Sequence, residues 1–342
     1  MKKNLKIIVG SIISLVFLYI FFRKANFHEV WEGIKNANLP LIFLSIVVGL
    51  SQNIFRCLRW RFLLDPIKKG TGFYNLFSTT IIGYMVSWII PGRLGELVRP
   101  ILLGQRENMS KSSAVATIVI ERFMDGLAVV FLFGICLIFN TAMFNAQSDH
   151  LLKAAFYGGT IFSFVSIAAF AFLLLLVWKK DAIRTFTERR WEKHKSAIVN
   201  RFFQVCHSFI EGASALRDVK ILIIAAAYSF VIWIVIGIGL WLSLKAMALP
   251  VSLSGTFILL PLLVIGIAIP TPGGVGTYHE AMQLGLIGLF QIPRDFAIST
   301  AIVVHAITIV PVIILGFIFL WKDGLTFRAV SHIENMASST KN

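Results

Sequence analysis

The amino-acid sequence predicts an all-α integral membrane protein that crosses the bilayer several times. Of its 342 residues, 57% are hydrophobic and only 14% are charged, whereas a soluble domain carries roughly 25% charged residues. The mean hydropathy of +0.81 agrees with this class. A spanning helix needs about 20 apolar residues, and long apolar windows fall at 5–22, 39–55, 73–90, 114–139, 154–178, 219–242, 257–290 and 296–321.

The first window looks like a signal peptide, because Lys2, Lys3 and Lys6 flank the start of its apolar run. The run is longer than the usual apolar core of about 7–15 residues, and no small-residue cleavage site follows it. We therefore expect it to remain in the protein as the first span.

Pro and Gly interrupt two of the windows. The window 73–90 ends in PGRLGE at 91–96, and the window 257–290 is divided by PTPGGVG at 270–276. Pro removes a helical donor and Gly loosens the backbone. Irregular backbone at membrane depth survives only where protein or water covers it, so both segments are predicted to be re-entrant, broken hairpins.

Positive charges set the expected orientation, because cytoplasmic loops carry an excess of Lys and Arg. The loop 179–220 holds ten and the segment 56–72 holds five, whereas 140–153 and 243–256 hold one each. The five are Arg56, Arg59, Arg61, Lys68 and Lys69. With both hairpins re-entrant, the prediction is six full spans in a bacterial cytoplasmic (inner) membrane, with both termini cytoplasmic. The connection 23–38, with three positive residues, fits this scheme least well.

The whole chain, 1–342, is predicted to be one transmembrane domain with a polar cytoplasmic segment at 181–217. Aromatic residues such as Trp191, Phe202 and Phe209 recur there at helical spacing. An amphipathic helix on the inner leaflet and an ordinary cytoplasmic helix packed on the bundle explain this pattern equally well.

The two interrupted segments define an internal repeat. The sequence PGRLG begins at 91 and PGGVG begins at 272, an offset of 181 residues. One span, one broken hairpin and one span occur twice at this offset, at 39–139 and 220–320. The expected topology makes the two copies inverted. Paired, interrupted segments of this kind indicate the binding site of a transporter.

Charged residues inside the window 114–139 are candidates for function, because inserting each costs about 2.5–3.5 kcal/mol. They are Glu121, Arg122 and Asp125. Glu121 and Asp125 share a helix face, and Arg122 lies three residues before Asp125. The alternative is an Arg122–Asp125 pair that only neutralises charge.

In the first hairpin, Arg93, Glu96 and Arg99 line one face if the chain is helical from Leu94. Two guanidiniums beside the donors of a Gly-rich helix start suit a phosphate. Arg93 and Arg99 are therefore predicted to bind an anionic headgroup, with Arg122 as the next candidate. The alternative is that both merely anchor the hairpin in the headgroup zone.

In the second hairpin, His279 and Glu280 follow the break directly, and His305 lies in the last span. A buried His beside a Glu can relay protons, and the repeat offset places His305 beside Asp125, so it is expected to approach the same cavity. The alternative for His305 is a hydrogen bond between helices. The residues predicted to gate or to couple protons are Glu96, Glu121, Asp125, His279, Glu280 and His305.

The glycines of the breaks complete the predicted binding site. They are Gly92, Gly95, Gly273, Gly274 and Gly276. Gly92 and Gly273 are expected to need a positive φ or a close backbone approach.

Enzyme signatures are absent from the sequence. HEAMQ at 279–283 lacks the second His of the zinc-protease motif, and no Walker lysine loop, GxSxG or Cys/His metal spacing occurs. Cys57, Cys136 and Cys206 show no paired spacing and are expected to be free thiols. Neither cofactor nor metal is predicted, and loop bias rather than nucleic-acid binding explains the net charge of +15.

Three motifs resemble the signatures of the lysylphosphatidylglycerol synthase transmembrane region, also called the flippase-like domain family. They are PGRLGELVRP at 91–100, ERFMDG at 121–126 and PTPGGVGTYHE at 270–280, and the resemblance covers nearly the whole chain. It implies lipid translocation. Two-part relatives add an aminoacyl transferase and move the aminoacylated lipid. No transferase is expected here, since the chain ends shortly after its last window, so the resemblance leaves the cargo open.

The prediction is a flippase-like transporter, not an enzyme, that moves an anionic lipid and is coupled to protons. The lipid classes are a phospholipid, a glycolipid or a polyprenyl-phosphate carrier. Two alternatives stay open: a membrane-embedded lipid-modifying enzyme that uses His279 and Glu280, and an accessory subunit of an envelope glycosyltransferase. The expected partner is a membrane lipid, and a homo-oligomer or a biosynthetic enzyme partner is left open.

Overall fold

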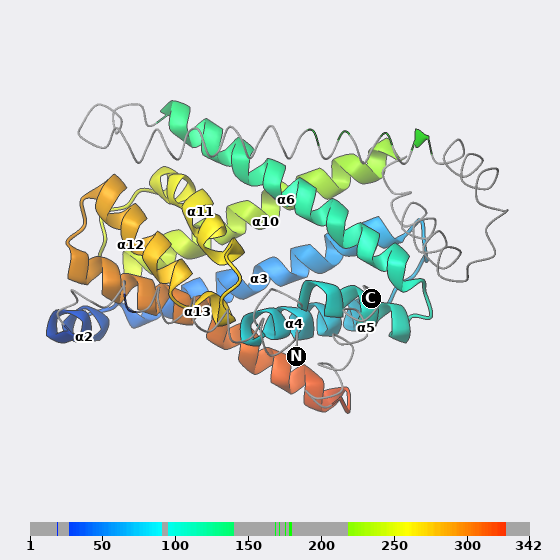
Figure 1. Ribbon diagram of the computed structural model, residues 1–342, viewed down its shortest axis with the longest axis horizontal. Helices are drawn as coiled ribbons and strands as arrows, with labels where there is room; N and C mark the ends of the chain where they lie inside the picture. The colour runs from blue at the N-terminus through cyan, green and yellow to red at the C-terminus, as the bar shows by residue number, and fades with distance from the viewer. Residues whose placement is uncertain are drawn as a thin grey trace.

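The computed structural model consists of helices and short connections over the residues it describes, which are 27–90, 95–139 and 218–325 together with a few isolated positions (19, 168, 171, 175, 178 and 179). The helices are α2 (Phe27–Lys35), α3 (Leu39–Leu64), α4 (Phe73–Ile89), α5 (Gly95–Arg106), α6 (Lys111–Phe139), α10 (Val219–Ala246), α11 (Leu253–Ala268), the 3₁₀ turn η3 (Pro272–Gly274), α12 (Thr277–Phe290) and α13 (Arg294–Lys322) (Figure 1). Within these ranges no strand occurs.

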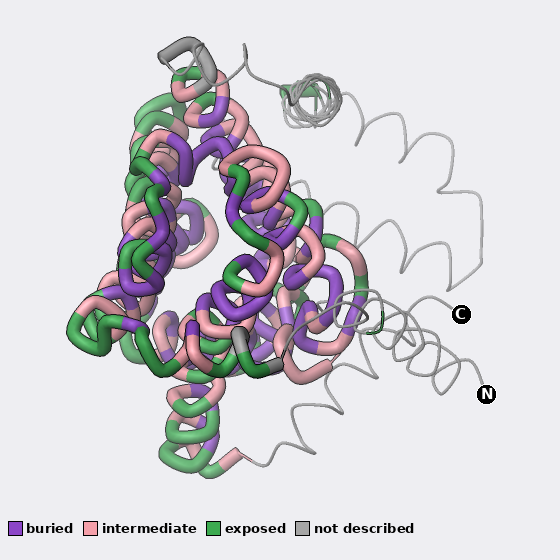
Figure 2. Tube along the Cα trace, turned by 90° about the vertical axis from the view of Figure 1, so that its left-hand side faces the viewer, coloured by how far each residue is buried: buried purple, intermediate pink, exposed green. Residues whose placement is uncertain are grey.

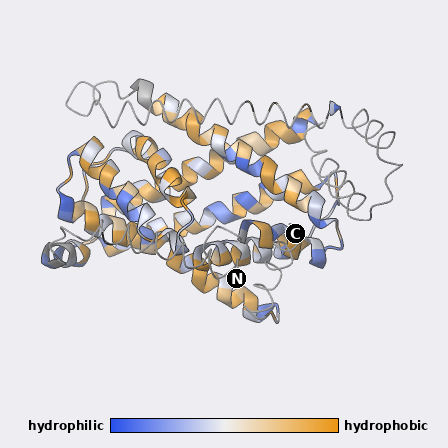
Figure 3. Ribbon diagram, in the orientation of Figure 1, coloured by the Kyte–Doolittle hydropathy of each residue, from blue (hydrophilic) through white to orange (hydrophobic). Residues whose placement is uncertain are grey.

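Three helices, α3, α10 and α13, are long and apolar enough to cross a membrane. Large apolar side chains such as Phe43, Ile223 and Ile314 are exposed on them, as expected for surfaces that face lipid. Figure 3 shows mainly apolar helices, with a hydrophilic stretch midway along α6. The chain is thus an all-helical, multi-pass membrane protein. The count of six spans stays a prediction, because 5–22, most of 154–178 and 181–217 lie outside the described residues.

Side-chain caps and small residues position the long helices. Asn38 accepts a hydrogen bond from the Leu41 N–H at the start of α3, and Asp218 accepts from the Lys220 N–H at the start of α10, which satisfies donors that a helix leaves open. The two helices pack along each other, and a Cβ added to Gly239 would lie 3.6 Å from the Gly49 nitrogen. Small residues at such crossings allow close backbone approach in membranes.

Each hairpin returns to the end of the molecule from which it starts. Where α4 starts and α5 ends, Asn75 Nδ2 donates to Glu107 Oε1 at 2.7 Å. Where α11 starts and α12 ends, a Cβ on Gly255 would lie 2.8 Å from Phe290 Cε1. Both hairpins thus turn back on themselves, and their re-entrant path in a membrane stays a prediction.

The two hairpins start from opposite ends. The first hairpin, which begins with α4, follows the end of α3. The second hairpin, which begins with α11, follows the end of α10. The end of α10 lies beside the start of α3. There the Asn38 N–H donates to the Ala246 carbonyl at 2.8 Å. The long helices therefore run in opposite directions, with one hairpin at each end of the pair.

The second break has the irregular backbone that the sequence predicts. Gly273, Gly274 and Gly276 adopt φ values of 63°, 67° and 87°, a region that side-chain-bearing residues avoid. The expectation for Gly273 is confirmed. Residues 91–94 of the first break lie outside the described residues, so the same expectation for Gly92 stays a prediction.

Helix order and packing recur between the two halves of the chain. A long helix, two half-helices and a long helix form α3–α6, and the same order recurs in α10–α13. The first long helices start at 39 and 219, and the last ones start at 111 and 294. The contacts are reciprocal, since α4 packs on α13 and α11 packs on α6. Buried residues lie mainly on the inward sides of the helices (Figure 2). The inverted relation of the two halves stays a prediction.

Candidate functional site

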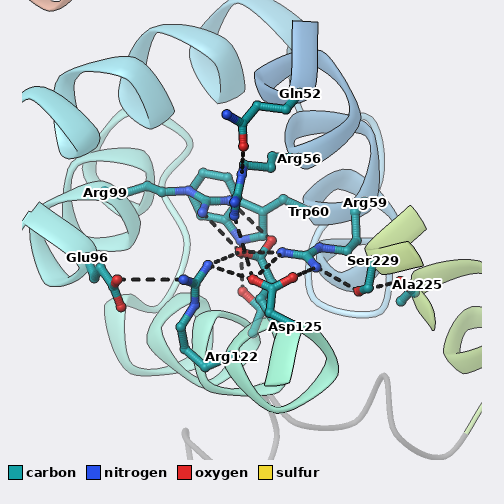
Figure 4. A network of polar contacts seen from close by, with 12 residues as sticks. Gln52, Arg56, Arg59, Trp60, Glu96, Arg99, Arg122, Asp125, Ala225 and Ser229 are labelled. Carbon is teal, nitrogen blue, oxygen red and sulfur yellow. Dashed lines mark hydrogen bonds and ion pairs between the residues drawn. The ribbon is translucent and has the colours of Figure 1, made fainter. Parts of the chain in front are cut away.

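Four arginines and three carboxylates converge where α3, α5 and α6 meet (Figure 4). The members are Arg56 and Arg59 from α3, Glu96 and Arg99 from α5, and Glu121, Arg122 and Asp125 from α6. We call this group the arginine–carboxylate cluster. Helical spacings of three and four residues place the members from each helix on one face, so three short stretches supply all seven groups.

The two α3 arginines correct the sequence-based count of loop charges. Arg56 and Arg59 were assigned to a cytoplasmic connection, but α3 continues to Leu64 and buries both side chains. Arg61, Lys68 and Lys69 remain as the positive charges of the segment 56–72 outside this buried pair. The signal for the longer helix was present in the sequence, because Trp60 and Leu64 continue the apolar pattern and are fully buried.

Asp125 is the centre of one half of the cluster. Arg59 Nη1 donates to its Oδ1 at 2.5 Å and to Ser229 Oγ of α10 at 2.7 Å. Arg122 Nη2 lies 3.1 Å and Arg56 Nη1 lies 3.6 Å from Asp125 Oδ2. The Arg122–Asp125 ion pair, which was the alternative to a functional role for these residues, is therefore present. It is one contact within a larger network.

Glu121 and Arg99 form the other half. The Arg99 guanidinium donates through both ends, at 2.9 Å and 3.2 Å, to the two carboxylate oxygens of Glu121, the bidentate geometry that Arg favours. Its Cζ also lies 3.8 Å from the Trp60 ring centroid, and the Trp60 Nε1–H donates to Thr117 Oγ1 at 2.8 Å. Arg99 is thus directed inward and buried, and Arg59 Nη2 approaches Glu121 Oε2 at 3.4 Å.

Arg122 and Glu96 form the accessible end of the cluster. Their side chains are 33% and 23% exposed, compared with 0% for Glu121 and 5% for Asp125. Arg122 Nη1 lies 3.6 Å from Glu96 Oε1. A ligand that reaches this cluster therefore meets Arg122 and Glu96 first.

The charge balance of the cluster favours an anion. Four guanidiniums against three carboxylates leave one positive charge, since Arg cannot be deprotonated in proteins. Several buried guanidinium nitrogens have no hydrogen-bond acceptor among the described residues: Arg56 Nη1, Arg59 Nε, Arg99 Nε and Arg122 Nε. Phosphate oxygens suit such donors.

The second hairpin holds a pair of histidines rather than a charged cluster. The His305 Nδ1 and His279 Nε2 atoms lie 3.0 Å apart, and both side chains are buried. The Gly276 N–H donates to His279 Nδ1 at 3.3 Å, and the Tyr278 ring stacks on His305 with centroids 4.6 Å apart. Glu280 lies in the first turn of α12, next to His279 in the sequence.

The helix α4 links the two polar groups. Tyr84 lies under Arg56, 5.3 Å from guanidinium carbon to ring centroid, and Trp88, one turn later, packs edge-on against His305. His305, on α13, also contacts His279, on α12. The hydrogen bond between helices that was the alternative role for His305 is thus present.

The remaining predicted residues are placed as follows. A Cβ on Gly95 would collide with the Gly83 carbonyl oxygen of α4, so Gly95 packs the hairpin together. Gly273 and Gly274 lie against Trp88. Gly92 and Arg93 lie outside the described residues. Over the described part of the chain, no group of three or more His, Cys, Asp or Glu could hold a metal ion.

Comparison with known proteins identifies relatives along most of the chain. A family model described as the lysylphosphatidylglycerol synthase TM region matches residues 7–316. A UPF0104 membrane protein of Methanothermobacter thermautotrophicus is 24% identical over 293 residues, 82% of this chain and 84% of that protein. The UPF0104 membrane protein MJ1595 of Methanocaldococcus jannaschii is 22% identical over 318 residues, 90% and 92% of the two chains.

One further relative carries a functional name. The glycosyltransferase AglD of Haloferax volcanii is 20% identical over 334 residues, which are 89% of this chain but only 52% of AglD. All three relatives come from archaea, so these comparisons do not support the expectation of a bacterial membrane in particular.

Proposed function

We propose, from the premise that the chain belongs to the lysylphosphatidylglycerol synthase transmembrane region family, that it is a flippase-like transporter of an anionic lipid. The observation that carries the proposal is the arginine–carboxylate cluster, which holds one net positive charge inside a membrane protein and has Arg122 at its accessible end. Ionisable groups at membrane depth are costly and mark substrate or ion pathways.

The chemistry of the cluster agrees with a lipid phosphate as cargo. A headgroup held in a polar cavity with its tails in the bilayer avoids placing the phosphate in hydrocarbon, where an unpaired charge is expensive. Arg122 would bind the phosphate first. Arg93 and Arg99 would hold it further along the path, with the glycines of both breaks allowing backbone approach. The lipid is a phospholipid, a glycolipid or a polyprenyl-phosphate carrier.

Proton coupling would use the groups next to this path. Glu96, Glu121 and Asp125 belong to the cluster, and His279 with His305 forms the buried pair of the second hairpin. A neutral imidazole can accept a proton on one ring nitrogen and donate one from the other, so the pair, with Glu280 next to His279 in the sequence, is the candidate coupling site. We further propose that both chain termini face the cytoplasm.

Two other functions remain as alternatives. A role as accessory to a lipid-linked glycosyltransferase is favoured by one observation, the similarity to a protein named glycosyltransferase AglD. A lipid-modifying enzyme would use His279 and Glu280 as acid and base. The partner would be a biosynthetic enzyme in the first case and a membrane lipid in the second.

Reconstitution tests the three functions together. Purified protein in liposomes with a headgroup-labelled anionic lipid is expected to change the leaflet of the label without changing the lipid covalently. A covalent change would mean an enzyme, and no change of either kind would mean an accessory protein. Arg122→Gln is expected to abolish transfer, whereas Arg61→Gln, an exposed arginine of α3 outside the cluster, should retain it.

A further inference from the structure

The three carboxylates of the cluster are not equivalent. Glu121 lies 2.9 Å from Arg99 and 3.4 Å from Arg59. Asp125 lies 2.5 Å from Arg59 and 3.1 Å from Arg122. Both are buried and hydrogen-bonded, and removing one member of such a buried pair is strongly unfavourable. The contacts of these two carboxylates are therefore the costly ones to break.

Glu96 differs in distance and in exposure. Its Oε1 lies 3.6 Å from Arg122 Nη1, which is an ion pair but too long for a hydrogen bond. Its side chain is the most exposed carboxylate of the cluster. Partly exposed ion pairs of this kind contribute little stability. Among the three carboxylates, Glu96 is therefore the most exposed one, and its contact with Arg122 is longer than the shortest arginine contact of Glu121 or Asp125.

The position of Glu96 also suits an exchange of anions. It is the second residue of α5 and follows the first break directly. The N-terminus of a helix favours negative charge, whether a carboxylate or a phosphate. If the Glu96 side chain turns away from Arg122, four arginines face two carboxylates, and the site gains one positive charge for the arriving ligand.

We infer that Glu96 occupies the place of a lipid phosphate on Arg122 in the empty transporter and that the phosphate displaces it on binding. This inference rests on the proposed function and names the substrate chemistry, a phosphate group carried by a lipid. Glu96 is then an internal competitor. Removing its charge tightens binding, whereas removing a residue that contacts the ligand weakens it.

Binding of a short-chain, water-soluble phosphatidylglycerol to the purified protein tests this. Glu96→Gln is expected to bind it about two- to fivefold more tightly than the wild type, the range that a weak, partly exposed ion pair supplies. Glu96→Ala should show the same gain. Asp65→Asn, which removes a carboxylate at the end of α3 outside the cluster, should bind as the wild type does. Arg122→Gln should lose binding, alone and combined with Glu96→Gln.

Two further probes identify the source of the phosphate. Short-chain diacylglycerol, a lipid without a phosphate, should gain nothing from Glu96→Gln, and inorganic phosphate should bind weakly to every variant. Preference for inorganic phosphate would overturn the lipid as its source. If the wild type binds the anionic lipid but neither Glu96 variant binds it more tightly, the inference is wrong and the proposed function stands. If no variant binds it, both fail.

Discussion

The guanidinium of Arg99 is the most tightly specified group of the site, because it combines a two-oxygen contact with Glu121 and stacking on Trp60. Arg99→Lys keeps the charge but loses the second hydrogen bond and the planar stacking. We expect it to lower the free energy of unfolding by about 1.5–3 kcal/mol, the worth of a hydrogen bond to a charged group, and to reduce lipid binding. Thermal unfolding in detergent, measured beside lipid binding, separates the two effects. An unchanged melting temperature would contradict the inward role of Arg99.

Arg59 and Asp125 test whether the cluster is a stabilising feature or a functional one. Both are buried, and Arg59→Met alone removes one of the guanidiniums that neutralise Asp125 and Glu121, which should cost up to about 3–5 kcal/mol of unfolding free energy. Combining Arg59→Met with Asp125→Leu should recover part of that loss, because well-packed apolar groups can replace a buried ion pair. Melting temperatures of the two single variants and the double variant form the test. Strictly additive losses would show that the two residues are not coupled.

At this scale, part of the site could be predicted from the sequence. Glu121, Arg122 and Asp125 were found because they interrupt an apolar window, and Arg99 because it follows a break. Arg56 and Arg59 were missed because a window that ends at the first arginine hides a helix that continues inward. Hydropathy averages charges, so it cannot distinguish a buried arginine from one in a loop.

Among the elements, the second break depends on a backbone that only glycine adopts easily. Gly273 has a φ of 63°, and a Cβ there would lie 3.2 Å from the Trp88 carbonyl oxygen. Gly273→Val should therefore abolish lipid transfer while the protein still inserts into the membrane. Gly134→Val is the matched control, because a Cβ at that position of α6 meets no atom within 4 Å. Equal activity of the two variants would show that the turn is a passive kink.

The end of the first hairpin is held by an acidic residue whose titration can be followed. Glu107 accepts hydrogen bonds from Asn75 and Lys68. Burial alone would raise the pKa of Glu107, but these contacts outweigh it and lower the pKa below its usual value. A lowered folded-state pKa means that the stabilisation is present above the unfolded pKa of about 4.3. It is lost as the pH falls through the folded value.

Glu107→Gln is accordingly expected to melt at a lower temperature than the wild type at pH 7. The difference should shrink as the pH is lowered from about 6 to 3, because wild-type Glu107 then becomes protonated as well. Melting curves of both proteins across this pH range provide the measurement. A difference that stays constant with pH would mean that the carboxylate charge contributes nothing.

Over the whole molecule, two similar halves carry different chemistry at matching positions. Arg122 and His305 each lie eleven residues after the first residue of α6 and α13. Arg122 belongs to the arginine–carboxylate cluster, whereas His305 stacks on Tyr278 and contacts His279. The constant offset of the sequence repeat matches His305 to a position next to Asp125, one residue or two away from this structural match, because it ignores small differences in turn length.

The orientation of the molecule can be tested at the two ends of α3, one of which adjoins the connection 23–38. Asn36 is exposed in the turn between α2 and α3, near the bond that joins Asn38 to Ala246. Lys69 is exposed at the other end of α3, beside Lys68 and its partner Glu107. A helix of 26 residues separates the two ends, about 39 Å at 1.5 Å per residue, enough to cross the bilayer.

Excess positive charge places the Lys69 end in the cytoplasm. In a background without cysteines, Asn36→Cys is therefore expected to react with an impermeant thiol reagent on intact cells, and Lys69→Cys only after the cells are permeabilised. Asp149→Cys and Lys193→Cys, at sequence-predicted outer and inner positions outside the described residues, should behave as Asn36→Cys and Lys69→Cys do. Reaction of both α3-end variants on intact cells would mean that α3 does not span the membrane. A reversed pattern would keep α3 as a span and invert the whole protein, and Arg122 would then receive its lipid from the opposite leaflet.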